Sequence, residues 1–213
     1  MLISRTDCQL LIVDIQEKLA SAIHDNDTVT RNAVRLLEAA RLLTVLAFVS
    51  EQYVKGLGPS LPAIRAAASA AQFFEKVHFS CAAEPGVLDL LRASGRPQII
   101  ICGTETHVCV LQSALGLLAA GVQVFLVADA ASSRTAENRQ AAIDRMRACG
   151  VSAALVTDAD GQLLGIFTGR DAICRMLADG RSPATTTLSE VMTTRVEALG
   201  PRDRAIDALH LMH

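Results

Sequence analysis

Aromatic residues are scarce in this 213-residue chain. They make up 3% of it, with one tyrosine and no tryptophan. A surface that stacks unpaired bases needs several aromatic rings, so this scarcity argues against a platform for single-stranded nucleic acid. The formal net charge is only −2, which argues against electrostatic attraction to nucleic acid or to an anionic membrane. We therefore expect neither as a partner.

Long apolar runs are also missing. No run approaches the roughly 18 residues of a membrane span, and the start of the chain has no basic segment before its apolar residues, as a signal peptide would. The six cysteines are scattered without a C-x-x-C pair in a chain that is 51% hydrophobic. This pattern indicates reduced thiols, a sizeable core and a cytoplasmic location.

Strand-like and helix-like segments alternate along the chain. Short apolar runs typical of buried strands occupy 8–16, 44–52, 98–103 and 122–130, with a weaker run at 72–80. Helical patterns occupy 29–43, 84–95, 107–121 and 135–150. This order predicts an α/β fold of three α/β/α layers around a doubly wound, mainly parallel sheet of the Rossmann-like kind. In such sheets chemistry gathers beyond the carboxyl ends of the strands.

Cys109 follows one of these strand ends and opens a helical pattern. A thiol at a helix start feels the positive end of the helix dipole and the free N–H groups there. These lower its pKa and can hold an oxyanion. We therefore treat Cys109 as a candidate nucleophile. The alternative is a core cysteine on the inner face of the helix.

Asp14 and Lys76 offer the complementary groups. Asp14 ends the first strand-like run, where a carboxylate can act as the general base for a thiol; the alternative is an aspartate that caps a turn. Lys76 lies between apolar neighbours, where its charge would keep Asp14 ionised; the alternative is a lysine whose stem covers apolar surface while its head reaches water. The strand ends that carry the three residues can converge.

Five blocks of the chain resemble, in order and spacing, the isochorismatase-like cysteine hydrolases. They are LLIVDIQEKL, SEQYVKGLGPSLP, FEKVHFSC, CGTETHVCVLQSALGLLAAGVQVFLVADAASSR and ENRQAAIDRMRACGV. The similarity covers about residues 5–152 and defines a predicted hydrolase domain over 1–152. In that family an Asp, a Lys and a Cys form the catalytic triad, which the resemblance assigns to Asp14, Lys76 and Cys109.

The resemblance also implies an oxyanion hole. The family has a cis peptide shortly before the Cys, which here would be Thr104–Glu105, and the N–H groups of Glu105 and Cys109 would be the donors. Gln16, Thr104 and His107 are candidate pocket residues. For His107 a structural role is the alternative.

A metal and a cofactor are not expected. The nicotinamidase branch of the family binds a metal through an Asp and two His residues after the second strand, and the matching block SEQYVKGLGPSLP contains no His. Isochorismatases proper cleave a vinyl ether and lack the Cys. Because Cys109 is present, we expect hydrolysis of a C–N bond in a small amide or ureide through a thioester.

The segment over 153–213 resembles part of a CBS domain, a module that commonly binds adenine nucleotides. The resemblance rests on GIFTGRD (165–171) and VMT (191–193). It implies that Thr168 and Asp171 contact ribose or phosphate. We therefore predict a partial, CBS-like α+β extension with a nucleotide as a candidate partner.

The CBS-like segment leaves alternatives open. It contains two expected strands joined by an Asp-Gly turn at Asp160–Gly161, but a CBS module works as a tandem pair and the second copy breaks off at His213. The alternative to a CBS module is that the segment substitutes for the closing strand and helix of the hydrolase. Its apolar surface favours a homo-oligomer. The competing functions are a cysteine hydrolase, a nucleotide-binding regulatory module and an inactive hybrid scaffold.

Overall fold

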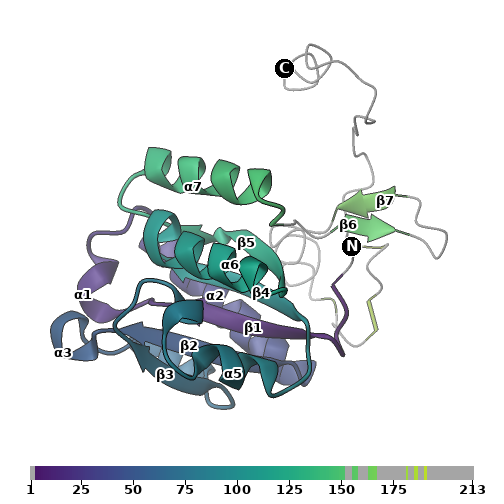
Figure 1. Cartoon of the computed structure of the whole chain (residues 1–213), viewed down its shortest axis with the longest axis horizontal. Coiled ribbons are helices and arrows are strands. Elements are labelled where there is room, and N and C mark those ends of the chain that lie inside the picture. Colours follow the sequence, from purple (N-terminus) through teal and green to yellow (C-terminus); the bar gives the residue numbers. More distant parts are fainter. Residues whose placement is uncertain are drawn as a thin grey trace, which may run out of the picture. The chain divides into compact units, whose positions relative to one another are not determined.

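The computed structural model describes residues 3–151, 155–157, 163–166, 181, 185–186 and 190. The chain divides into two units, Met1–Ala154 and Leu155–His213. The first unit is a parallel sheet with helices on both faces (Figure 1). The predicted α/β fold is therefore confirmed, while the functional assignment of the two segments remains a prediction.

The sheet of the first unit has five parallel strands in the order β3-β2-β1-β4-β5. They are β1 (Cys8–Val13), β2 (Leu46–Gln52), β3 (Gln72–Lys76), β4 (Gln98–Thr104) and β5 (Gln123–Ser132). The order runs outward from β1 in both directions, which is the doubly wound topology. β1 is therefore central and completely buried, and Asp14 directly follows it.

The helices cover both faces of this sheet. They are α1 (Glu17–Ala20), α2 (Asn26–Leu42), α3 (Val54–Leu57), α4 (Pro62–Ala67), α5 (Val87–Arg92), α6 (Leu111–Ala119) and α7 (Ala136–Ala148). Alternate residues of β1 point to two separate cores: Leu11 packs with α5, α6 and α7, whereas Leu10 packs with α2 and α4. This alternation is the pleat of a strand that is buried on both sides.

β3 ends sooner than the strand-like run 72–80 predicts. The Glu84 carboxylate accepts the backbone N–H groups of Val77 (2.8 Å) and His78 (3.1 Å), so these groups do not continue the sheet. The same carboxylate contacts the His78 ring, and this contact lowers the pKa of Glu84. Val77 and Phe79 consequently stand 66% and 60% exposed. The chain then enters η1 (Cys81–Ala83), a short 3₁₀ helix.

The helix predicted over 107–121 begins in an unexpected form. A π-helical segment, η2 (Thr106–Val110), precedes α6. Cys109 therefore lies within a π turn, two residues before the first residue of α6. Single π turns inside helices are often found at functional sites.

Gly103 allows β4 to approach the end of β1 closely. Its φ is +128°, and a Cβ at this position would lie 2.0 Å from the carbonyl oxygen of Val13. Gly103 also pairs with Val13 in the sheet. Glycine is therefore required here both by conformation and by space.

We expect Gly103→Ala to lower the free energy of unfolding by roughly 3 kcal/mol or more, because it adds a backbone clash to an unfavourable φ. Urea denaturation would measure this loss. Gly121→Ala is a matched control, because Gly121 also has a positive φ but an added Cβ would meet nothing within 4 Å; its cost should be about 1 kcal/mol. Equal losses in the two variants would contradict the close approach of β4 to β1.

The second unit contributes two described strands, β6 (Leu155–Thr157) and β7 (Leu163–Ile166). They pair in an antiparallel manner, as the two-strand pattern predicts. The expected turn at Asp160–Gly161 and the candidate nucleotide contacts Thr168 and Asp171 lie outside the described residues, so the CBS-like segment stays a prediction. No helix in the described part of the chain is long and apolar enough to cross a membrane.

Candidate active site

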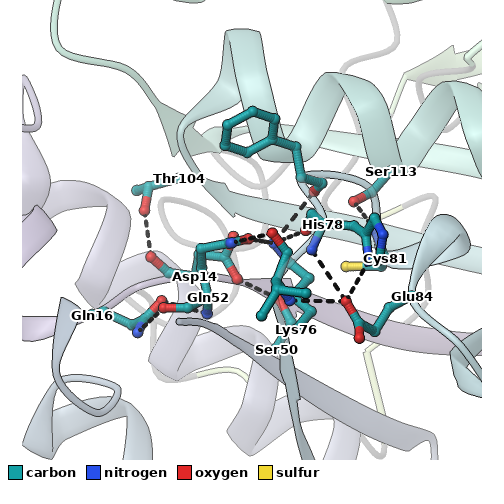
Figure 2. Close-up of polar contacts among 12 residues, drawn as sticks. Asp14, Gln16, Ser50, Gln52, Lys76, His78, Cys81, Glu84, Thr104 and Ser113 are labelled. Carbon is teal, nitrogen blue, oxygen red and sulfur yellow. Dashed lines mark hydrogen bonds and ion pairs between the residues drawn. The ribbon is translucent and has the colours of Figure 1, made fainter. Parts of the chain in front are cut away.

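Asp14 and Lys76 form a buried ion pair at the carboxyl edge of the sheet (Figure 2). The Lys76 Nζ lies 2.7 Å from Asp14 Oδ2, and both side chains are completely shielded from solvent. Asp14 follows the central strand β1, whereas Lys76 is the last residue of the edge strand β3. The predicted convergence of these two strand ends is present.

Three further acceptors surround the Lys76 ammonium. Its Nζ lies 2.6 Å from Gln52 Oε1 and 3.3 Å from each of the carbonyl oxygens of His78 and Phe79 (Figure 2). The two carbonyls belong to the turn that Glu84 organises. A buried charge is tolerated when it is paired and hydrogen-bonded in this way.

The Asp14 carboxylate is held from two sides. Oδ2 accepts from Lys76, and Oδ1 accepts from the Ser50 hydroxyl at 2.7 Å. Burial raises the pKa of the Asp14 carboxyl above its usual value, and the charge of Lys76 and the Ser50 hydrogen bond act in the opposite direction. A carboxylate with a raised pKa is better matched to accepting a proton near neutral pH.

Cys109 lies against this pair, and its side-chain contact with Asp14 affects the pKa of both groups. The residue is 5% exposed. The expected lowering of the thiol pKa at a helix start is wrong. Burial raises the pKa of Cys109 well above its ordinary value, and the negative charge of Asp14 raises it further, outweighing Lys76. The resting side chain is therefore a thiol.

A second thiol, Cys81, adjoins the same groups. Its backbone N–H donates to the Ser113 hydroxyl at 2.8 Å, and Ser113 lies four residues after Cys109 on the helix. Burial raises the pKa of Cys81 to about 11, with the charge of Asp14 as the next cause. Cys81 is thus an uncharged neighbour of the ion pair at neutral pH.

The predicted cis peptide is present at Thr104–Glu105. The Glu105 side chain is buried and its Oε1 accepts from Arg134 Nε at 2.6 Å. His107 Nδ1 lies 3.0 Å from the Ser133 hydroxyl and 3.4 Å from Glu105 Oε2. These contacts tie Glu105 and the start of η2 to the residues that directly follow β5.

Comparisons with known proteins decide the family. The isochorismatase domain profile matches residues 8–160. An isochorismatase domain-containing protein 2 from Danio rerio is 41% identical over 143 residues, which are 67% of this chain and 71% of that protein. The chain belongs to the isochorismatase domain family. The proposed CBS-like segment gains no support from these matches.

Solved structures similar to this isochorismatase domain chain include the following three. MAR1 ribonuclease from Caenorhabditis elegans is 30% identical with a TM-score of 0.70, covering 94% of this chain and 99% of its own. YcaC from Escherichia coli, an octameric hydrolase of unknown specificity, is 27% identical with a TM-score of 0.68, covering 71% and 76%. YcaC from Pseudomonas aeruginosa, with covalent acrylamide, is 28% identical with a TM-score of 0.67, covering 71% and 77%.

Two of the residues expected in a pocket of this isochorismatase domain make structural contacts, and their place in a pocket stays a prediction. Gln16 is fully buried, and its amide donates to the carbonyl oxygens of Gln52 (3.0 Å) and Gly58 (2.6 Å). The Thr104 hydroxyl donates to the Asp14 carbonyl oxygen at 2.7 Å. Both side chains therefore fix the main chain around the ion pair. Within the described residues, no group of three or more His, Cys, Asp or Glu side chains could hold a metal ion.

Sequence reasoning missed Ser50 and Gln52. They alternate with Glu51 at the end of β2, so their side chains share one face of the sheet. Ser50 contacts Asp14 and Gln52 contacts Lys76. The sequence signal that could have identified them is a pair of polar residues, two positions apart, at the end of a buried strand.

Proposed function

We propose that this chain is a cysteine hydrolase that cleaves a C–N bond of a small amide or ureide, with Asp14, Lys76 and Cys109 as its catalytic residues. The observation that carries the proposal is the fully buried Lys76–Asp14 ion pair with the Cys109 thiol against the same carboxylate. A thiol beside a base, with a cation that orients that base, are the parts of an activated nucleophile.

In the first step the Cys109 sulfur attacks the substrate carbonyl carbon while its proton passes to Asp14, and a tetrahedral intermediate forms. Asp14 returns the proton to the leaving nitrogen, the C–N bond breaks, and a thioester remains on Cys109. Asp14 then takes a proton from water, the hydroxide attacks the thioester, and the acid product leaves while Cys109 regains its proton.

The raised pKa of Cys109 supports this order of events. A buried thiol beside a carboxylate does not ionise on its own near neutral pH, so the proton must move to Asp14 as the carbonyl is attacked. Lys76 holds Asp14 in position and offsets part of the effect of burial on its carboxyl. Its own Nζ has four protein acceptors, so we assign it no direct contact with substrate.

The oxyanion of the intermediate needs hydrogen-bond donors. We propose the N–H groups of Glu105 and Cys109 for this role, following the family resemblance. Donors fixed in the main chain need no reorganisation as charge develops on the oxygen. The contacts of Glu105 with Arg134 and His107 support a rigid segment here.

The relatives add support to the proposal. YcaC from Escherichia coli is a hydrolase of unknown specificity, and YcaC from Pseudomonas aeruginosa holds covalent acrylamide. The Escherichia coli protein is octameric. Together with the exposed side chains of Tyr53, Val77 and Phe79, this supports a homo-oligomer for the present chain as well.

Trapping of the acyl-enzyme tests the proposal. The native chain would be mixed with a panel of small primary amides and ureides, quenched in acid, and analysed by mass spectrometry together with release of ammonia. We expect an adduct of the acyl mass on the peptide that contains Cys109, which hydroxylamine removes because it cleaves thioesters. Ammonia release without any adduct on Cys109, or an adduct on another residue, would overturn the proposal.

A further inference from the structure

We propose that Gln52 is a positioning residue of this reaction, whose carboxamide oxygen holds the Lys76 ammonium against Asp14. The inference rests on the proposed function. It adds a neutral fourth member to the triad, which acts through Lys76 and does not touch the reacting atoms.

Sheet register places Gln52 beside Lys76. The two residues are direct partners in the parallel pairing of β2 with β3, so their side chains share one face. The Gln52 Oε1 lies 2.6 Å from Lys76 Nζ (Figure 2), and both residues are buried. This distance is as short as that of the Lys76–Asp14 ion pair, 2.7 Å.

The orientation of the Gln52 carboxamide is fixed. Its Nε2 donates to the Val77 carbonyl oxygen at 2.9 Å, so the oxygen must face Lys76. Its main-chain N–H donates to Gln16 Oε1 at 2.7 Å, and its carbonyl oxygen accepts from Gln16 Nε2 at 3.0 Å. Both polar ends of the side chain and both polar groups of the backbone are therefore held. A side chain whose polar groups are all held by hydrogen bonds can orient a neighbouring side chain.

The neutral charge of Gln52 is as informative as its position. Lys76 has one carboxylate partner, Asp14, and its remaining acceptors are amide oxygens. The full positive charge of the Lys76 ammonium can therefore favour the form of the Asp14–Cys109 pair that has lost one proton and is negatively charged. A carboxylate at position 52 would be a second anionic partner of Lys76 and would place another negative charge near Asp14 and Cys109. Both effects would raise the pKa at which the Asp14–Cys109 pair loses its proton.

The other titratable groups around Lys76 are few. The thiols of Cys81 and Cys109 face the ion pair, and Cys81 is a protonated thiol at neutral pH. The Glu84 carboxylate contacts the His78 ring and accepts the main-chain N–H groups of Val77 and His78, in the turn whose carbonyls accept from Lys76. None of these groups changes in the variants below.

The test is the pH dependence of Cys109 alkylation by iodoacetamide in the full chain, followed by peptide mass spectrometry. The rate rises with pH as the Asp14–Cys109 pair loses its proton. We expect Gln52→Glu to move this rise upward by at least about half a pH unit, which is roughly a threefold slower reaction on the rising limb. We expect Gln52→Met, which removes the acceptor without adding charge, to lower the plateau rate roughly tenfold by misplacing Lys76.

Gln9 offers a matched control. It is a buried glutamine on β1, and its amide donates to the carbonyl oxygens of Leu91 (2.8 Å) and Arg96 (3.2 Å), at the opposite edge of the sheet from Asp14. Gln9→Glu and Gln9→Met should lower the melting temperature without moving the midpoint of the alkylation profile. This separates a loss of packing from a loss of positioning.

The outcomes distinguish the two proposals. The first outcome is that the rise of the alkylation rate with pH is lost in Asp14→Asn, while the folded Gln52→Glu and Gln52→Met chains keep the native profile. This outcome would overturn the role of Gln52 alone. If Asp14→Asn leaves the native profile unchanged, the proposed function and the Gln52 role fall together. A shifted midpoint in Gln52→Glu with unshifted Gln9 variants supports both.

Discussion

Cys109→Ala should lose at least about a thousandfold of the rate at which the native chain releases ammonia from its best amide. The reason is that no thioester can form without the sulfur, and Asp14 has no thiol from which to take a proton. Cys109 is nearly buried, but the change to alanine removes a single heavy atom. It should therefore cost only about 1 kcal/mol of stability. Ammonia release and thermal unfolding, measured on the same sample, would separate the two effects.

Cys102→Ala provides the control for this prediction. Cys102 is fully buried on β4 but packs in the core beneath α2 and α4, whereas Cys109 belongs to the core beneath α5, α6 and α7. Its replacement should lower the melting temperature to a similar or greater extent while ammonia release continues. Turnover that survives in Cys109→Ala would exclude the thioester route.

Lys76→Met is expected to lower the free energy of unfolding by about 3–5 kcal/mol at neutral pH, because the Asp14 carboxylate would remain buried without its charged partner. Methionine has a similar length, so little packing is lost. The carboxyl can escape this penalty by taking a proton. Its pKa in the folded variant would then lie further above that of the unfolded chain, where an aspartate has a value of about 3.9.

The sign of the pH dependence follows from this raised pKa. Between the unfolded and folded pKa values the folded variant binds more protons, so its stability falls as pH rises through that window. The deficit of Lys76→Met relative to the native chain should therefore be smallest in mild acid. Urea denaturation at two pH values would measure it.

The double variant Asp14→Asn with Lys76→Met completes the comparison. With no charge left in the core, it should recover much of the stability that Lys76→Met loses, so that the two changes are strongly non-additive. Additive losses would mean that the ion pair does not form in solution. Neither variant should turn over an amide.

The sequence allowed the fold to be predicted because its strands are short apolar runs separated by helical patterns. The order of the strands at the site was harder to predict, since it depends on pairing between segments that are distant in the sequence. Gln52 shows this clearly. Its place beside Lys76 follows from the register of β2 against β3, and no local pattern specifies that register.

The charge state of Cys109 could not be predicted from its place in a helix either. The dipole argument is local, whereas burial and the Asp14 carboxylate act from segments about one hundred residues away in the sequence. The early end of β3 has a similar origin. It depends on Glu84, which captures two backbone N–H groups that a strand pattern over 72–80 would assign to the sheet.

The ion pair also links the middle of the sheet to its margin. Lys76 comes from β3, which in the described sheet pairs only with β2, whereas Asp14 follows the innermost strand. A peripheral strand can detach locally at a lower free energy than the whole domain unfolds. Such detachment would carry the ammonium away and leave the carboxylate alone in the interior. The cation of the proposed catalytic triad therefore also holds the edge strand to the sheet, and a change at Lys76 would affect both properties.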